Sequence, residues 1–307
     1  MGARAATTAT RSQFDLDDDV AYRAWRAWKL ARVPATIDEL IVDVQDPRAL
    51  TATERAALLD RIAGCNSAIY RCTTATDERG LVPALGAQLG LHRLDANWLA
   101  DEDGISPIAV SRASTAAAPR ADFIPYTDKP IRWHTDGYYH PAARRIRAMI
   151  LHCVRPAASG GVNALLDPEL AYIALRDASP AFVRALMRPD VMTIPARDGE
   201  DGVARPAQSG PVFSVDAGDG CLHMRYTART RSIEWRDDAA TRAARDCLDA
   251  LLGSDSRWIL RTRLAAGMGL VGHNVLHDRS AFVDDSERPR LLLRARYLDR
   301  VDCGAAP

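Results

Sequence analysis

The sequence lacks the features that mark several large classes of protein. No apolar run approaches the roughly 18 uninterrupted residues of a membrane helix, and Met1–Arg11 contains no apolar segment long enough for a secretory signal. Acidic and basic residues number 40 each, so the chain has no net charge with which to attract nucleic acid. We therefore expect a cytoplasmic protein that acts without a membrane or nucleic-acid partner.

Cysteines are few and scattered, at positions 65, 72, 153, 221, 247 and 303. They form no Cys-x-x-Cys motif and no closely spaced framework, which favours reduced, partly buried thiols over disulfides. The N-terminal third also holds no cluster of Cys and His residues, so we expect no zinc module there.

Nothing in the chain marks a domain boundary, because it has neither an internal repeat nor a low-complexity linker. The 307 residues suit a single domain, which leaves a homo-oligomer open. Apolar periodicity and capping residues predict helices, the second of them capped by Thr51 or Thr53. These helices are expected over residues 17–33, 51–64, 81–91, 168–187 (interrupted near 179–180) and 238–252.

Strand signals dominate the second half of the chain. They are expected at residues 105–113, 123–127, 147–154 and 163–166, in a hairpin over 211–226, and in two strands around 277 and 290–297. The pattern alone indicates a mixed α+β fold. It suits a mostly helical region over residues 1–120 and a jelly-roll core over 121–300, with a helix-containing insertion at about 167–260.

The most informative segment is His134-Thr135-Asp136, and a third candidate ligand, His277, follows far downstream. Residues i and i+2 of a β-strand point to the same face, so His134 and Asp136 can share one metal ion. Two imidazoles and one carboxylate can occupy one face of an octahedral Fe(II) ion and leave the opposite positions open. The sequence therefore predicts an iron site.

Three further histidines compete for a place in that site. His273 is the alternative third ligand, although its position also suits a place beside the site or facing solvent. His140 follows the metal motif closely, and His152 lies inside an apolar strand, where a hydrogen-bonded structural role is expected.

A second signal lies in the last expected strand. Arg290, Leu292, Arg294 and Arg296 share one face by period-two counting. In a closed barrel one face of that strand looks inward, and a buried guanidinium needs an anionic partner to offset its desolvation. A dicarboxylate is such a partner, because the arginine fork matches carboxylates in bidentate fashion.

Together these segments resemble the taurine dioxygenase and γ-butyrobetaine hydroxylase group of Fe(II)/2-oxoglutarate oxygenases, from about Ile124 to Asp299. The resemblance implies the double-stranded β-helix, which is a jelly roll, and it implies that the two histidines and the aspartate hold the iron. The segments that carry it are Trp133–Tyr139, Leu151–Cys153, Gly160–Asn163, Val275–Arg279 and Arg290–Arg294.

The resemblance also assigns roles around the cosubstrate. Arg290, thirteen residues after His277, would grip the distal carboxylate of 2-oxoglutarate. The spacing varies within the family, so Arg288 is the alternative. Arg294 would lie near the inner carboxylate or the substrate, and Asn163 stands where the taurine enzyme has a Thr that bonds the distal carboxylate.

The expected activity is hydroxylation of an unactivated C–H bond of a small molecule, with O2 as second cosubstrate and release of succinate and CO2. Tyr138 and Tyr139 are the candidates for lining the substrate pocket. Because Asp136 is present, a halide is not expected to replace it on the iron. The alternatives are a metal-dependent hydrolase that uses the same three ligands, and a non-catalytic metal-binding sensor barrel.

Overall fold

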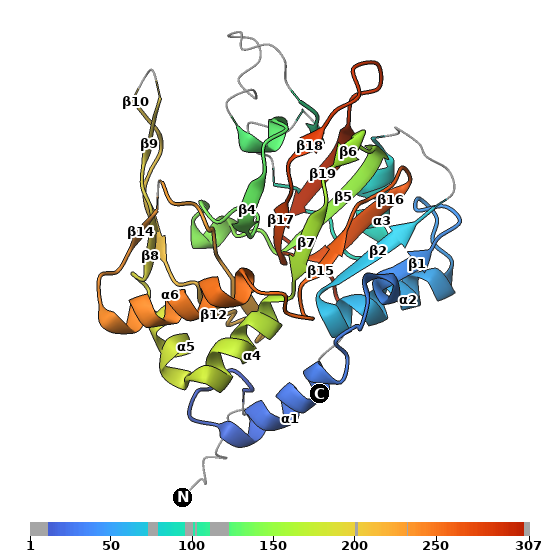
Figure 1. Ribbon diagram of the computed structural model, residues 1–307. Helices are drawn as coiled ribbons and strands as arrows, with labels where there is room; N and C mark the ends of the chain where they lie inside the picture. Colours follow the sequence, from blue (N-terminus) through green and yellow to red (C-terminus); the bar gives the residue numbers. More distant parts are fainter. Residues whose placement is uncertain are drawn as a thin grey trace, which may run out of the picture.

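The computed structural model describes residues 12–72, 79–95, 101, 103–110, 123–199, 202–231 and 233–303 (Figure 1). The expected N-terminal tail Met1–Arg11 and the last part of the expected strand 105–113 lie outside these residues. In the described part, no helix has the length and apolar character needed to cross a membrane. All six cysteines lie within it, and no two of them form a disulfide.

Two sheets form the centre of the molecule (Figure 1). The larger has the order β1-β2-β16-β5-β19-β3 and the smaller β15-β7-β17-β4. All neighbouring strands are antiparallel except β1 and β2, which are parallel. Their bounds are β1 Ile41–Asp43, β2 Ser67–Arg71, β3 Ser106–Ile108, β4 Ile131–His134, β5 Ala148–Arg155, β7 Asn163–Leu166, β15 Leu260–Thr262, β16 Met268–His273, β17 Leu276–Arg279 and β19 Leu291–Tyr297.

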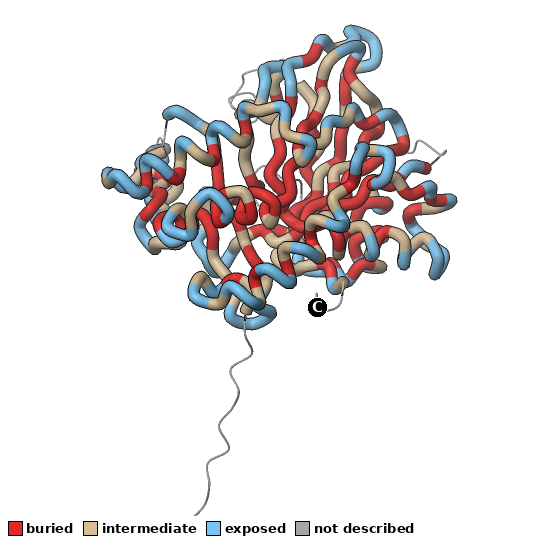
Figure 2. Tube along the Cα trace, turned by 60° about the horizontal axis from the view of Figure 1, so that its bottom comes forward, coloured by how far each residue is buried: buried red, intermediate tan, exposed pale blue. Residues whose placement is uncertain are grey.

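The two sheets pack face to face. One apolar cluster joins Leu165 of the smaller sheet to Ile69, Met149, Leu270 and Leu292 of the larger. The outer face of the larger sheet is covered by helices α2 (Ala52–Cys65) and α3 (Leu81–Gln88). The strands are therefore buried along most of their length, as Figure 2 shows, while exposed residues lie on helices and turns.

The last strand alternates as expected. Leu293, Ala295 and Tyr297 face the cluster under α2 and α3, whereas Leu292 faces the cluster between the sheets. Arg294 and Arg296 share the inner face with Leu292, because side chains two residues apart point the same way. A bulge in the pairing with β5 lies between Leu291 and Leu292.

The expected insertion leaves the smaller sheet after β7 and returns at β15, where Leu260 pairs with Leu165. Its helices pack with the N-terminal helix α1 (Asp19–Leu30) in a third apolar cluster. The insertion contains α4 Pro168–Ala178, α5 Pro180–Leu186, β8 Met192–Ile194, β9 Arg197–Gly199, β10 Gly202–Arg205, β11 Gln208–Gly210, β12 Phe213–Val215, β13 Leu222–Met224, β14 Glu234–Trp235 and α6 Ala239–Leu252.

One expectation from the sequence needs correction. The strand expected at residues 123–127 is a 3-10 turn over Ile124–Tyr126, because Pro125 fixes its own φ and cannot donate to a sheet. Beside its helices, the N-terminal region also contributes β1 and β2 to the larger sheet. These two strands are short, so their sequence shows no clear alternation.

Candidate metal centre

His134, Asp136 and His277 converge on one point. One potential ligand atom from each of the three buried side chains lies within 4.8 Å of the others. His134 ends β4, Asp136 follows two residues later, and His277 is the direct partner of His134 across the β4–β17 pair. The imidazole centroids are 4.2 Å apart. The expected ligand set is therefore assembled by strand pairing.

Hydrogen bonds fix which nitrogen each imidazole offers. Nδ1 of His134 donates to the carbonyl of Arg132, and Nδ1 of His277 donates to the carbonyl of Val275, both at 2.9 Å. Each ring therefore keeps Nε2 as an acceptor, which is the form that binds a metal. Burial and, to a smaller extent, the neighbouring His277 lower the pKa of His134 to about 3, so His134 is neutral near pH 7.

The Asp136 carboxylate has one engaged oxygen and one free oxygen. Oδ1 lies 3.2 Å from a guanidinium nitrogen of Arg294 and 3.9 Å from one of Arg296. Oδ2 is buried without a hydrogen-bond partner. Burial alone would raise the pKa of Asp136, but the two arginine charges outweigh it and the pKa is lowered. A buried anionic oxygen beside two free imidazole nitrogens fits a divalent cation.

Asn274 holds the backbone of the segment that carries His134 and Asp136, which we call the metal loop. Its side-chain oxygen accepts from the Asp136 amide at 2.8 Å, and its side-chain nitrogen donates to the Asp136 and Ile146 carbonyls at 2.8 and 2.9 Å. Thr135, between the two ligands, points the other way and accepts from the Tyr226 amide at 3.1 Å. The loop is thus held from both sides, by the β16–β17 corner and by the insertion.

Arg290 lies in a cavity of about 230 Å³, partly open to solvent, that it shares with Asn163, Cys153 and Leu292. Its side chain is buried, and within the described part of the chain its Nη1 has no hydrogen-bond partner. Burial lowers the pKa of Arg290 to about 10, although the nearby Asp284 charge opposes this, so the guanidinium still carries its charge near neutral pH. A buried, charged fork with a free donor suits a carboxylate ligand.

The other residues expected around the cosubstrate lie as follows. The Asn163 side chain donates to the Asp278 carbonyl at 3.0 Å, which leaves one N–H and the oxygen of its amide uncommitted. Arg288 is exposed, unlike Arg290. Gly160 ends the two-residue strand β6 (Ser159–Gly160), which pairs with β18 (Phe282–Val283), and Gly160 and Gly161 line the cavity with φ of 71° and 68°. A Cβ on Gly160 would lie 2.3 Å from the Ala281 carbonyl oxygen, so only glycine fits.

Tyr138 and Tyr139 follow the metal loop and take different positions. The ring of Tyr138 meets the ring of His134 edge to face at 6.5 Å. The hydroxyl of Tyr139 accepts from Arg296 at 3.0 Å, and the Arg205 guanidinium lies 5.7 Å from its ring centroid. Both tyrosines therefore lie at the edge of the metal centre, on the side of the insertion.

The competing histidines do not join the triad. His273 is buried, with Nδ1 2.6 Å from Asn66 Oδ1 and Nε2 3.2 Å from the Val301 carbonyl, so the expectation of a solvent-facing ring is wrong. Nδ1 of His140 is 3.0 Å from the Arg144 carbonyl. His152 is hydrogen-bonded to the Tyr70 hydroxyl at 2.9 Å inside the core, which confirms its expected structural role.

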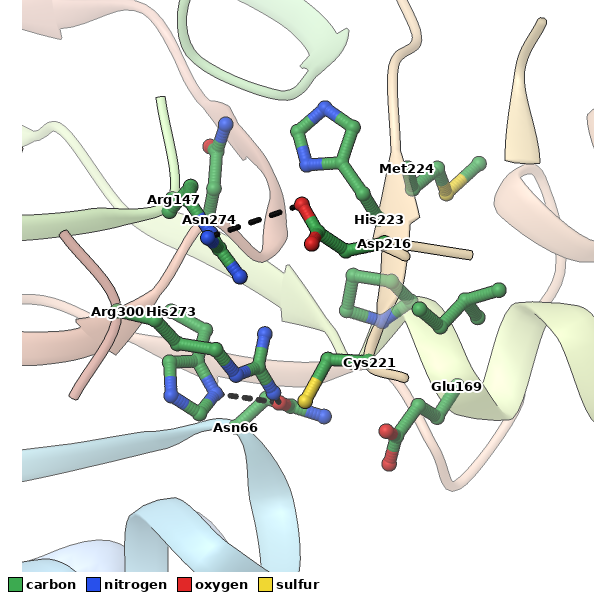
Figure 3. A pocket seen from close by; sticks show the side chains of 12 residues that line it. Asn66, Arg147, Glu169, Asp216, Cys221, His223, Met224, His273, Asn274 and Arg300 are labelled. Atoms are coloured by element: carbon green, nitrogen blue, oxygen red, sulfur yellow. Dashed lines mark hydrogen bonds and ion pairs between the residues drawn. The ribbon is translucent and has the colours of Figure 1, made fainter. Parts of the chain in front are cut away.

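A larger polar pocket is lined by Asn274 together with Arg147, Asp216, His273 and Arg300 (Figure 3). It holds about 420 Å³, partly open to solvent. Two of its arginines have partners within the pocket: Arg147 lies 3.7 Å from the Asp216 carboxylate, and Arg300 donates to the Asn66 side chain at 3.3 Å. The ligand triad does not line it, so the size of a pocket does not locate the chemistry here.

Three residues of the site were missed by sequence reasoning as contributors: Asn274, Arg296 and Asp95. Arg296 was placed on the inner face of its strand but given no role. Asp95 is fully buried and accepts from Arg144 and Arg296. Its segment carries no motif, so no signal in the sequence could have identified it.

The family model "Taurine catabolism dioxygenase TauD, TfdA family" matches residues 34–296. No curated protein matches the sequence.

Solved structures with a similar fold include three oxygenases, and at these identities the likeness establishes the fold. An asparagine oxygenase in complex with Fe(II), 2S,3S-3-hydroxyasparagine and succinate is 16% identical, covers 95% of this chain and 87% of its own, and has a TM-score of 0.57. The non-heme iron oxygenase OrfP, with Fe, succinate and (3R,4R)-dihydroxy-L-Arg, is 18% identical, with 82% of each chain covered and a TM-score of 0.59. A putative alpha-ketoglutarate-dependent taurine dioxygenase from Burkholderia xenovorans is 17% identical, with 85% and 87% covered and a TM-score of 0.55.

Proposed function

The chain belongs to the taurine catabolism dioxygenase TauD, TfdA family, and on that basis we propose that it hydroxylates an unactivated C–H bond of a small molecule in an Fe(II)- and 2-oxoglutarate-dependent reaction that releases succinate and CO2. The observation that carries this proposal is the pairing of a buried ligand triad with a separate, buried arginine, Arg290, whose Nη1 has no hydrogen-bond partner among the described residues.

His134, Asp136 and His277 would hold the iron. Their free Nε2 atoms and the unpartnered Oδ2 of Asp136 point into one small volume, and together they leave the remaining positions of an octahedral ion open. Bound iron, with its cosubstrates, supplies the oxidising chemistry, and the protein supplies position and exclusion of water. The buried surroundings of the triad serve that second task.

Arg290 would bind the distal carboxylate of 2-oxoglutarate. The cavity next to it offers the Nη1 donor, the uncommitted part of the Asn163 amide and an apolar wall from Leu292. An arginine fork binds a carboxylate in bidentate fashion, which offsets the burial of both charges. Arg294, between the cavity and the triad on the same face of β19, would act on the inner carboxylate or on the substrate.

The strand order supports the assignment of the fold as a double-stranded β-helix. Two antiparallel four-stranded arrangements, β16-β5-β19-β3 and β15-β7-β17-β4, face each other across one apolar cluster. We assign them as the two halves of a double-stranded β-helix. The insertion after β7 would then cover the end of the barrel where His134 and His277 lie, and Tyr138 and Tyr139 would line the substrate pocket beneath it.

A hydrolase with the same triad is disfavoured because it gives Arg290 no function. A sensor barrel is disfavoured by the family, which is one of dioxygenases. Neither alternative explains why a buried, charged guanidinium keeps an Nη1 without a hydrogen-bond partner, among the described residues, in a cavity separate from the ligands.

The decisive experiment uses the purified protein loaded anaerobically with Fe(II) and titrated with 2-oxoglutarate. We expect a metal-to-ligand absorption band that saturates, and succinate once O2 is admitted. The Asp136→Ala variant is the control, because it should lose the band while keeping its fold. Iron binding without the band and without succinate would contradict the proposal and favour a hydrolase or a sensor.

A further inference from the structure

Asp95 brings the N-terminal region to the metal centre. It is 1% exposed, and it lies beside β19, where Leu94 bridges to Tyr297 and the Asp95 amide donates to the Arg296 carbonyl at 2.8 Å. Its Oδ1 accepts from Arg144 at 2.7 Å and its Oδ2 from Arg296 at 2.6 Å. A fully buried carboxylate is costly unless charges offset it, and these two arginines do so.

Arg296 connects this carboxylate to the metal loop. Its side chain is 3% exposed, and Nη2 donates to Asp95. Nη1 donates to the Tyr139 hydroxyl at 3.0 Å and lies 3.9 Å from Asp136 Oδ1. One rigid guanidinium plane therefore touches the N-terminal region, a pocket tyrosine and a proposed iron ligand.

This arrangement has two consequences for the site. Both nearby cations, Arg294 and Arg296, stand on the Oδ1 side of Asp136, so Oδ2 alone is left for a metal. Because the Tyr139 oxygen already accepts from Arg296, the phenol hydrogen remains available to donate to another group. Among the described residues, Asp95 gives Arg296 its one carboxylate contact shorter than the 3.9 Å to Asp136, and that contact would be lost without Asp95.

We propose that Asp95 and Arg296 are positioning residues of the metal centre. Held by Asp95, Arg296 fixes which Asp136 oxygen faces the metal and orients the Tyr139 hydroxyl as a donor towards the substrate side. This inference rests on the proposed iron site, and it assigns to the N-terminal region a direct part in building that site.

A merely structural ion pair would give a different result from a positioning pair when the metal environment is observed directly. The probe is Co(II), whose visible absorption bands report the number and arrangement of its ligands and need no turnover. The variants are Arg296→Met, Arg296→Lys, Asp95→Asn and Tyr139→Phe. The matched control is Arg176→Met, which removes an equally buried arginine that binds the carbonyls of Gln13 and Asp15 beside α4.

We expect Arg296→Met to shift the Co(II) bands and to weaken Co(II) binding by roughly 10–100-fold, as loss of a group that orients a metal ligand does. Arg296→Lys should also shift them, because one ammonium cannot reach three partners in a fork. Asp95→Asn keeps one acceptor and should give a smaller change in the same direction. Arg176→Met should lower the thermal midpoint but leave the spectrum unchanged.

Tyr139→Phe separates the effect of Arg296 on the metal ligand from its effect on the Tyr139 hydroxyl. The variant removes only the hydroxyl, so it should leave the Co(II) spectrum as in the wild type. If Arg296→Met lowers stability but keeps the wild-type spectrum and affinity, the pair is structural and the inference fails alone. Should Arg296→Met not fold, Asp95→Asn and Arg296→Lys decide by the same criterion. If the wild type binds no Co(II), the iron site fails and this inference fails with it.

Discussion

In both histidines of the proposed iron site, the Nδ1–H group donates a hydrogen bond to the backbone carbonyl of the residue two positions earlier. This local bond fixes the ring orientation before any metal arrives, so the cost of ordering the ligands is already met by the fold. His273, four residues before His277, has both ring nitrogens engaged elsewhere and faces the polar pocket of Figure 3.

The ligand assignment can be tested by comparing these two histidines. His277→Ala should abolish tight Fe(II) binding in an anaerobic titration, because two ligands cannot complete the site. His273→Ala should bind iron normally while losing stability, because its contacts with Asn66 and Val301 are buried. Normal titration of the His277→Ala protein would move the third ligand elsewhere.

Arg290 gives the second test at this scale. Removing one partner of a desolvated, hydrogen-bonded charge pair costs on the order of 2–5 kcal/mol. Arg290→Ala should therefore raise the 2-oxoglutarate dissociation constant by roughly 30-fold or more, with little change in iron affinity. Arg290→Lys should recover part of the loss, because a point charge cannot reproduce the fork. The readout is the Fe(II) charge-transfer band during titration with 2-oxoglutarate.

Arg288→Ala is the matched control for strand register, since Arg288 is exposed two residues away. A large loss in Arg288→Ala with none in Arg290→Ala would contradict the placement of the cosubstrate.

Residue-scale prediction from sequence succeeded where a side chain has chemistry that is rare inside a protein. The predicted family and enzyme class are confirmed by the family match, and the predicted ligand triad does come together. Asn274 and Asp95 could not be predicted in the same way. Their roles depend on which backbone and side-chain atoms the fold brings near them, and asparagine and aspartate are common in turns.

At the scale of elements, capping residues predicted where helices begin more reliably than residue patterns predicted short strands. Helix α2 begins with a complete capping box, in which the Thr51 side chain accepts from the Glu54 amide at 3.2 Å and Glu54 accepts from the Thr51 amide at 2.7 Å. The sequence left Thr51 and Thr53 as alternatives, and the structure selects Thr51. Short strands such as β1 and β2 escaped prediction, because their identity comes from pairing with each other and, for β2, with β16, rather than from their own pattern.

The cap can be measured directly. Thr51→Ala should lower the free energy of unfolding by about 1 kcal/mol, because an N-cap acceptor is lost. Thr53→Ala, an exposed threonine in the same turn, should change it by only a few tenths of that amount. Urea denaturation of both variants makes the comparison, and equal effects would show that the box does not stabilise the helix.

At the scale of the whole molecule, buried histidines set the response to acid. Burial, together with the nearby Arg145 and Arg147 side chains, lowers the pKa of His223 to about 3. The unfolded chain binds a proton at His223 below about pH 6.5, whereas the folded chain does not until near pH 3. Stability is therefore lost as the pH falls through that window, by up to about 1.4 kcal/mol per pH unit for one such group.

We expect the metal-free protein to lose thermal stability between pH 6.5 and pH 5, and His223→Gln to reduce that slope. His92→Gln, at an exposed histidine, controls for the loss of an imidazole as such. Thermal midpoints measured across this pH range give the answer. A slope unchanged in His223→Gln would place the acid sensitivity in other groups.

The long insertion between β7 and β15 is a segment that can be exchanged while the barrel stays the same. It leaves and re-enters the smaller sheet at Leu165 and Leu260, which face each other as a strand pair, so its length and content are free of the barrel's own geometry. Its attachments to the metal loop include backbone bonds from the Thr135 amide to the Tyr226 carbonyl and from the Ala228 amide to the Trp133 carbonyl, which do not depend on the identity of a side chain. Side chains add to them, because Arg225 donates to the Tyr138 carbonyl at 2.7 Å and Trp133 donates to the Leu252 carbonyl at 3.1 Å. A redesign that keeps these contacts can therefore change the cover of the pocket and redirect substrate choice, while β4 and β17 keep the same three metal ligands.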